Sequence, residues 1–324
     1  MRANKELEQE TRFKKELKDI SGKKFTIKGI ENIGGVEVTK IRPNHDSYYY
    51  KLEKPKTKIV IHNTVGVLRS DIASLTKKDS HVSVPYVIAR DGTIYEIFEP
   101  EMWSYHLGRG AKGGNKVNSS TSIGIELSSY GPLKEDSGNL ETAYSRIPYT
   151  TKSGKAAVTK RDIYCSLSEN QYYVELNSEF RGVKYFAGYT DAQLKSLKIL
   201  IEYLCDRFNI PKTLLPESER YEVFKTATAA KEYTGICSHV NFRESGKWDV
   251  GPEMDWDYIV PAETKAMTGI VYSNSVIDNE IEDTYEQNEI VFEEEVEIKS
   301  NTTDKKFSVL TFVLNLVSKF LKRN

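Results

Sequence analysis

The alternation of hydrophobic and polar positions changes along the chain between strand-like and helix-like patterns. β-Branched runs at 36–42 and 57–64 predict strands, and the second run is nearly continuous in apolar residues, which is typical of a strand buried on both faces. Two further apolar runs within 84–98 flank the Asp-Gly pair at 91–92, a dipeptide that favours a tight turn between antiparallel strands. We therefore predict a β-hairpin there.

Another strand and one long helix follow further along the chain. Residues 121–131, TSIGIELSSYG, alternate as a strand does, whereas 189–210 has helical periodicity. Thr190 and Gln193 have the spacing of a capping box at the start of that helix. The apolar face of the helix consists of Leu194, Leu197, Ile201, Leu204 and Phe208. Strands interleaved with such a helix predict an α/β fold whose sheet is covered on at least one side.

The same patterns divide the chain into segments. Residues 1–50 are predicted to form an N-terminal helical arm and a lead-in strand, and 51–265 the main domain. An insertion at about 132–183, rich in Ser, Thr, Lys and Tyr, interrupts that domain with loops and short strands. The apolar stripe of the arm is thin, so we expect the arm to be solvated. Its members are Leu7, Phe13, Leu17 and Ile20.

Two segments of different character follow the main domain. Residues 266–304 form an acidic linker by composition, with ten acidic residues between 278 and 297. Residues 305–324 have polar positions at helical spacing and predict a C-terminal amphipathic helix. Its apolar core is shorter than the roughly 20 residues of a membrane span. Docking on a membrane surface and docking on a protein both remain open for this helix.

Composition and charge exclude some classes of partner. The formal net charge of −1 over 324 residues provides no basic field for nucleic acid, so no nucleic-acid partner is expected. Three cysteines without paired spacing argue against a disulfide framework. The first 20 residues are charged throughout and contain no apolar stretch, so we expect no secretory signal peptide.

Histidine and aspartate positions indicate candidate metal chemistry. His62 ends the buried strand predicted at 57–64, where open α/β sheets place ligands. His239 follows the short apolar run GIC, and Asp249 comes ten residues later. Two histidines and a carboxylate are a common catalytic zinc set that leaves a fourth position open. The alternatives are a core histidine bonded to the backbone and a polar surface loop, with Cys237 as a competing ligand or a packing residue.

Five sequence blocks, in a fixed order between residues 56 and 256, carry a family resemblance. They are VIHNT, VPYVIARDGTIYEIF, WSYHLG, SIGIELSSYG and HVNFRESGKWDVGP. Together they resemble the zinc-dependent N-acetylmuramoyl-L-alanine amidases of the phage-lysin type, relatives of the peptidoglycan recognition proteins. The resemblance implies a central mixed β-sheet flanked by helices. It also implies hydrolysis of peptidoglycan at the amide bond between N-acetylmuramic acid and L-alanine.

The resemblance assigns roles to particular residues. His62, His239 and Asp249 correspond to the ligands of one zinc ion. Lys247 corresponds to the catalytic lysine of the family, and Glu126 to the catalytic glutamate of the members with an aspartate ligand. Glu126 alternates with an apolar row of its strand, so it faces either a cleft or solvent, and the resemblance selects the cleft.

Four further residues are predicted substrate contacts. His106 matches a histidine that lines the substrate cleft in the family, and Trp103 is a candidate for stacking on sugar or peptide, although local packing is the common role of a loop tryptophan. Tyr86 and Asn63, which lie in two of the matching blocks, complete the set.

The sequence also departs from the family at two neighbouring positions. Pro85 stands where a histidine is usual, and Val84 stands where some members carry a catalytic tyrosine. Catalysis is therefore expected to depend on Glu126.

The predicted function is peptidoglycan hydrolysis as a phage endolysin or a virion-associated lysin. With no signal peptide expected, the predicted location is the host cytoplasm until release to the cell wall, or the virion. Three alternatives remain open, which are a non-catalytic peptidoglycan-binding module, a structural virion component that retains an amidase domain, and a cytoplasmic wall-recycling amidase that acts on soluble muropeptides. Peptidoglycan is the expected partner, and residues 305–324 add a possible membrane-surface or protein contact.

Overall fold

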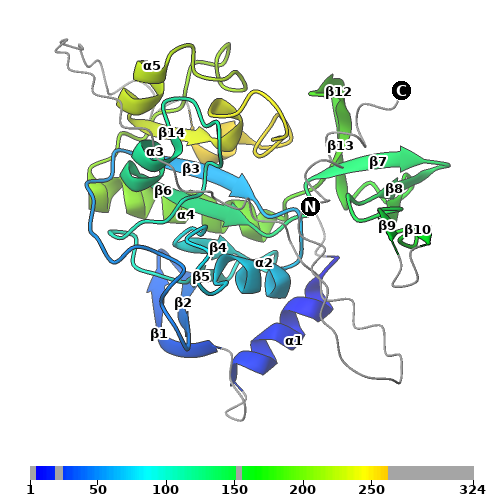
Figure 1. Ribbon diagram of the computed structural model, residues 1–324, viewed down its shortest axis with the longest axis horizontal. Coiled ribbons are helices and arrows are strands. Elements are labelled where there is room, and N and C mark those ends of the chain that lie inside the picture. Colours follow the sequence, from blue (N-terminus) through cyan, green and yellow to red (C-terminus); the bar gives the residue numbers. More distant parts are fainter. Residues whose placement is uncertain (1–4, 19–24, 151–154, 262–324) are drawn as a thin grey trace.

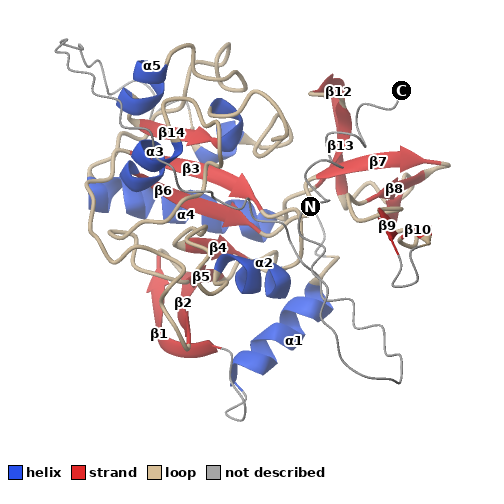
Figure 2. Cartoon of the chain, in the orientation of Figure 1, coloured by secondary structure: helices blue, strands red, loops and turns tan. Residues whose placement is uncertain are grey.

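A seven-stranded mixed sheet forms the centre of the computed structural model, which describes residues 5–18, 25–150 and 155–261. Its strand order is β1-β2-β5-β4-β6-β3-β14 (Figures 1 and 2). In that order the strands are Phe25–Ile33, Val36–Pro43, Ile94–Glu96, Tyr86–Ile88, Ser122–Leu127, Lys58–Asn63 and Gly235–Ser238. The three strands β6, β3 and β14 run parallel, while β4 and β5 form the predicted antiparallel hairpin. This mixed sheet confirms the predicted fold class.

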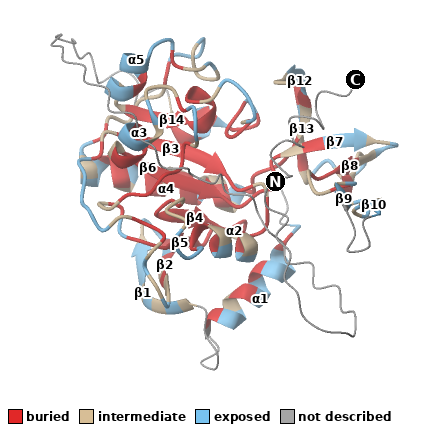
Figure 3. Cartoon of the chain, viewed as in Figure 1, coloured by how far each residue is buried: buried red, intermediate tan, exposed pale blue. Residues whose placement is uncertain are grey.

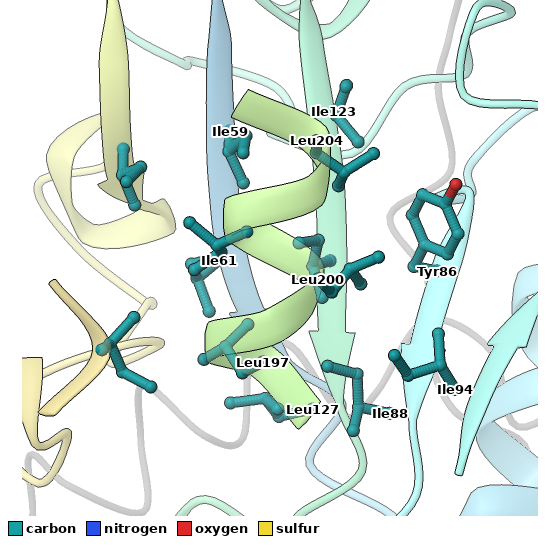
Figure 4. Packing of buried hydrophobic residues seen from close by; sticks show 14 of the residues in the cluster. Ile59, Ile61, Tyr86, Ile88, Ile94, Ile123, Leu127, Leu197, Leu200 and Leu204 are labelled. Atoms are coloured by element: carbon teal, nitrogen blue, oxygen red, sulfur yellow. The ribbon is translucent and has the colours of Figure 1, made fainter. Parts of the chain in front are cut away.

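Helix α4 (Asp191–Phe208) covers one face of the sheet (Figure 4). It begins with the predicted capping box, in which the Thr190 side chain accepts from the Gln193 N–H. Leu197, Leu200 and Leu204 are fully buried. They pack on the β3 and β6 residues that point the same way, among them Ile59, Ile61 and Ile123. Each such leucine contributes about 1.5–3 kcal/mol through the apolar area that it removes from water.

The opposite face of the sheet is covered by shorter elements and carries polar positions. The short helices there are α2 (Leu68–Leu75), α3 (Asn115–Thr121) and α5 (Ala227–Glu232). Every residue of β3 and β6 is buried (Figure 3). Because side chains alternate along a strand, the residues between the isoleucines face this second side, and they include His62 and Glu126. The four-residue helix α6 (Trp256–Ile259) lies on the first side, against α4.

Helix α1 (Leu7–Lys18) corrects the prediction of a solvated arm. Phe13 and Leu17 are only 2% and 5% exposed, and they pack in one cluster with residues of α2 and β5. The Glu10 carboxylate accepts hydrogen bonds from the backbone N–H groups of Arg90 and Asp91 in the β4–β5 turn. A hydrophobic stripe alone cannot reveal this docking, because part of the buried face is acidic and is satisfied by distant partners.

The insertion forms sheets of its own (Figure 1). A five-stranded sheet has the order β11-β8-β7-β13-β12, and β9 and β10 form a separate pair. The five strands, in that order, are Ile163–Ser166, Asn139–Glu141, Pro132–Asp136, Val183–Ala187 and Tyr173–Phe180, and the pair is Pro148–Thr150 and Ala156–Val158. The larger sheet has its own small apolar cluster around Leu140 and Tyr164, and it runs directly into α4 at its end.

The predicted acidic linker and C-terminal helix lie outside the described residues. Among the helices that the structure does describe, none combines the length and the apolar character needed to cross a bilayer.

Candidate metal centre

The parallel register of three central strands brings two histidines to one edge of the sheet. His62 is the penultimate residue of β3 and lies opposite Glu126 of β6. On its other side β3 pairs with β14, where Ile61 lies opposite Ser238. His239 follows immediately and opens the short 3-10 helix η1 (His239–Asn241). Since these strands end at the same edge, residues that are distant in the sequence meet there.

The structure places the three predicted ligands around a single point. His62 Nδ1 lies 2.9 Å from His239 Nδ1 and 3.4 Å from Asp249 Oδ2, and the latter two atoms are 2.9 Å apart. All three side chains are buried, and they form a group that could hold a metal ion. Bonds of about 2.0–2.1 Å to a tetrahedral zinc ion would place the donor atoms about 3.3 Å from one another. The observed spacing fits such an ion.

The hydrogen bond of His239 leaves Nδ1 as the donor atom for a metal. The Nε2 of His239 lies 3.0 Å from the carbonyl oxygen of Leu107, which can only accept. Nε2 therefore carries the hydrogen, and in the neutral ring Nδ1 has a free lone pair. Burial lowers the pKa of His239 to about 4, which keeps the ring neutral as metal binding requires.

A longer hydrogen-bond relay fixes His62 in the same way. The Ser122 hydroxyl donates to the Asn118 carbonyl at 2.6 Å, so it accepts from His106 Nε2 at 2.8 Å. The Nδ1 of His106 then accepts from His62 Nε2 at 2.9 Å. We infer that His62 carries its hydrogen on Nε2 and offers Nδ1 to the centre.

These two tautomers, taken together, call for a cation at the centre. Two Nδ1 lone pairs at 2.9 Å repel each other, and an additional proton is disfavoured because burial lowers the pKa of His62 as well. Burial opposes ionisation of Asp249, but the neighbouring ring of His239 and the charge of Lys247, together with hydrogen bonds to both histidines, hold the pKa of its carboxyl well below the usual range. Two neutral imidazoles and one carboxylate therefore meet the requirements of a divalent metal ion.

Glu126 lies beside the group as a buried carboxyl with one free oxygen. It is 9% exposed, and its Oε2 has no hydrogen-bond partner in the described structure. Burial, followed by the charge of Asp249, raises the pKa of Glu126 well above its usual value. A carboxyl with a raised pKa next to a candidate metal site is suited to proton transfer.

Lys247 is half-buried and acts on the centre through its charge. That charge lowers the pKa of Glu126 and of Asp249, and it also lowers the pKa of both ligand histidines. Lys247 is therefore the cation of the described chain that acts on every titratable member of this group.

One of the predicted substrate contacts requires correction. His106 is buried, and its ring nitrogens lie within hydrogen-bond distance of His62 and Ser122, so it positions a candidate ligand. Its contact with substrate stays a prediction. Tyr86 is 1% exposed on the α4 face of the sheet, away from His62, so that prediction is wrong. The sequence could not separate the two faces, because the hairpin strands are apolar on both.

Asn63 and Trp103 are also buried in contacts of their own. The Asn63 amide donates to the Tyr189 hydroxyl at 3.1 Å. Trp103 is 5% exposed and stacks on Tyr50 with 4.3 Å between ring centroids, which is the local packing considered above. Cys237 packs in an apolar cluster and is not among the three grouped ligands.

Two residues of the site were missed in the sequence although a signal for them existed. Ser122 and Gly124 share the alternating face of β6 with Glu126. A Cβ atom at Gly124 would lie 2.5 Å from the Val84 side chain and 3.2 Å from His106 Nδ1. The glycine therefore lets His106 lie against the strand, and the serine anchors it there.

Comparisons with known proteins relate this chain to a family. Residues 52–252, more than half of the chain, match a family model described as N-acetylmuramoyl-L-alanine amidase. A solved structure of the amidase AmiD from E. coli, in complex with a muropeptide substrate, is similar, with 20% identity and a TM-score of 0.39 over 74% of this chain and 66% of AmiD. The amidase LysC from Clostridium intestinale has 13% identity and a TM-score of 0.34 over 68% and 93% of the two chains. A comparison with curated proteins gives no match.

The family match, and not these distant structures, carries the assignment. The likeness covers slightly less than two thirds of AmiD, and identities and TM-scores this low add no argument of their own. The matched range includes the hairpin, the strands β3, β6 and β14 and all three grouped ligands. It confirms the family resemblance found in the sequence. The chain belongs to the N-acetylmuramoyl-L-alanine amidase family.

Proposed function

We propose that this chain is a zinc-dependent peptidoglycan hydrolase that cleaves the amide bond between N-acetylmuramic acid and L-alanine. The observation that carries the proposal is the convergence of two neutral imidazoles and one carboxylate within 3.4 Å, beside a buried carboxyl that has a free oxygen. Membership of the amidase family supports the same reaction.

Zinc is the metal that this donor set suits best. Imidazole nitrogen and carboxylate oxygen are common zinc ligands, and three protein ligands leave the fourth position open, as in catalytic zinc sites. When bound by His62, His239 and Asp249, a zinc ion supplies Lewis-acid chemistry, because it polarises a carbonyl group and acidifies water to a pKa of about 7.

The residues of the chain then carry the proton and the charge. Glu126 takes a proton from the attacking water and returns it to the leaving amine nitrogen. Its raised pKa lets the carboxyl hold that proton between the two steps. Lys247 places positive charge where the carbonyl oxygen becomes negative, and such stabilisation is typically worth about 3 kcal/mol.

The test is product analysis on purified peptidoglycan. With zinc present, the full chain is expected to release peptides that carry a free amino group on L-alanine, and a chelator should stop that release. Mass spectrometry identifies the bond that is broken. A chain that binds zinc and peptidoglycan but releases no such peptide would be a binding module, and the proposed reaction would be rejected. The role as a phage lysin stays a prediction from the sequence.

A further inference from the structure

The loop that carries the third ligand has little regular structure of its own. We call residues 239–250 the ligand loop; they include His239, Lys247 and Asp249. After η1 no helix or strand is present until α6 begins at Trp256. A metal site tolerates only small displacements of its donor atoms, about 0.5 Å. Something outside the loop must therefore hold it.

Arg181 lies at the tip of the β12–β13 hairpin of the insertion and donates hydrogen bonds to this loop. Its Nη1 donates to the carbonyl oxygens of Arg243 at 2.9 Å and of Lys247 at 2.7 Å. Its Nη2 donates to the carbonyl oxygen of Val240 at 3.1 Å. The guanidinium thus joins the beginning, the middle and the far side of the loop, which the planar donor fork of arginine suits and a single ammonium does not.

A second contact runs in the opposite direction, from the loop to the hairpin. The indole Nε1 of Trp248 donates to the carbonyl oxygen of Arg181 at 3.1 Å. Trp248 is only 8% exposed, and its ring packs in one apolar cluster with Leu176, Val183 and Phe186 of the two hairpin strands. Trp248 lies between Lys247 and Asp249 in the sequence, so this packing fixes the backbone on which both are carried.

The hairpin also closes against the residues that follow Asp249. A Cβ atom added at Gly251 would lie 2.8 Å from the Phe180 ring, so the two segments are in close contact there. The ligand loop is thus held by the insertion through polar and apolar contacts.

We propose that the β12–β13 hairpin is a built-in brace for the ligand loop, and that Arg181 is the positioning residue that holds Lys247 and Asp249 in place for metal binding and catalysis. The proposal rests on the proposed metal centre but concerns a part of the chain that takes no part in ligation. It gives the insertion a role that its Ser-, Thr- and Tyr-rich composition did not indicate.

The experiment uses the full chain and three variants. Arg181→Ala removes the donors, and Arg181→Lys keeps the charge but not the fork. Arg161→Ala is the control, because Arg161 belongs to the same insertion and bonds to Asp136 and Glu141 inside it. Hydrogen exchange is followed in the ligand loop before and after addition of zinc. The amide of Val240, bonded to Asp249, and that of Phe242, bonded to His239, report on its closure. Zinc affinity is measured by competition with a chelator.

If the hairpin holds the ligand loop in place, the variants should differ in a specific way. Arg181→Ala should speed exchange of the loop amides about tenfold or more, since hydrogen bonds to a charged donor are the strong ones. It should also weaken zinc binding by about ten- to a hundredfold, the usual effect of losing a group that positions a ligand. Arg181→Lys should fall between Arg181→Ala and the parent, and Arg161→Ala should match the parent in the loop.

Two results would overturn the proposal that the hairpin holds the ligand loop. The first is that the loop amides of Arg181→Ala exchange at the rate of the parent. The second is that Arg161→Ala speeds this exchange as much as Arg181→Ala does, which would mean that the change reflects a less stable insertion and not the loss of the Arg181 contacts. If the parent bound no zinc, the proposed function would fail, while the exchange rates measured without zinc would still decide the role of the hairpin.

Discussion

At the scale of single residues, the centre depends on which nitrogen of each ring carries hydrogen. His239 is set by one backbone carbonyl, whereas His62 is set by a relay through His106 and Ser122. The relay ends at the carbonyl of Asn118, which can only accept, and this gives every bond in it a direction. Residues outside the three grouped ligands therefore decide which nitrogen His62 can offer to a metal ion.

Substitution of His106 tests this relay. His106→Ala removes the acceptor for the His62 Nε2 hydrogen, so that His62 can turn or change tautomer. We expect zinc affinity to fall by about ten- to a hundredfold in chelator competition. Ser122→Ala, which removes only the far end of the relay, should have a smaller effect. Unchanged affinity in His106→Ala would show that the relay does not matter for the ligand.

Substitution of Glu126 can separate the proposed metal binding from the proposed proton transfer. Glu126→Gln has nearly the same shape but cannot take a proton, and Glu126 is not one of the three grouped ligands. The variant should retain zinc and lose about 10²- to 10⁴-fold in the rate of amide cleavage. Metal analysis and release of peptide from cell walls measure the two properties. Cleavage at the parent rate would remove Glu126 from the mechanism.

The sequence predicts ligands better than it predicts contacts. His62, His239 and Asp249 can be proposed because few residue types bind metals, and because strand ends are favourable positions. Tyr86 was misassigned because the side of the sheet that a fully apolar strand presents to a site depends on the neighbours of that strand. The same limit hid the contact between His106 and His62, which joins residues 44 positions apart.

At the scale of elements, α2 is tied to β6 through a buried carboxyl. The hydroxyl of Ser128, just after β6, donates to Asp71 Oδ2 at 2.6 Å, whereas Asp71 Oδ1 has no hydrogen-bond partner in the described structure. Burial raises the pKa of Asp71 from 3.8 to about 7. The folded protein therefore favours the neutral carboxyl at a position where the unfolded chain would be ionised.

This shift predicts how stability changes with pH. Between about pH 4 and pH 7 the folded state holds a proton on Asp71 that the unfolded state has lost, so this contribution to stability disappears as the pH rises through 7. Asp71→Asn should be more stable relative to the parent at pH 8 than at pH 4, by about 1.4 kcal/mol for each pKa unit of the shift. Urea unfolding at the two pH values measures the difference. If Asp71→Asn and the parent differed in free energy of unfolding by the same amount at both pH values, the raised pKa of Asp71 would be contradicted.

Elements with strong periodicity are predictable from the sequence, and elements whose partners are distant are not. The α4 helix, the β4–β5 hairpin and strands β2, β3 and β6 follow from local pattern and capping chemistry. The docking of α1 depends on Glu10 reaching the turn at Arg90, 80 residues away. No local pattern contains that information.

At the scale of the whole molecule, one buried arginine joins three parts of the chain. Arg90 in the β4–β5 turn lies 2.6 Å from the Glu6 carboxylate at the start of α1, and its Nη1 donates to the Gly188 carbonyl just before α4. The guanidinium side chain is only 1% exposed, so its charge has little access to water. The N-terminal helix, the hairpin and the end of the insertion are therefore coupled through this residue.

Removal of Glu6 tests that coupling. Glu6→Ala leaves the Arg90 charge buried with less compensation, which typically destabilises by about 3–5 kcal/mol. Glu16→Ala, which breaks the exposed pair with Arg69, should change the free energy of unfolding by less than about 1 kcal/mol. Denaturant unfolding compares the two variants. Equal effects would show that Arg90 does not need its carboxylate partner.

The placement of the two histidines determines when, during synthesis of the chain, the group of three ligands is complete. His62 and His239 are separated by 177 positions, and they become neighbours only when β14 joins the edge of β3. A nascent chain still on the ribosome has the first histidine long before the second, so its incomplete centre lacks two of the three ligands. The full group of three ligands is therefore present only after synthesis has passed Asp249, and a product that terminates earlier lacks the group that could hold a metal ion.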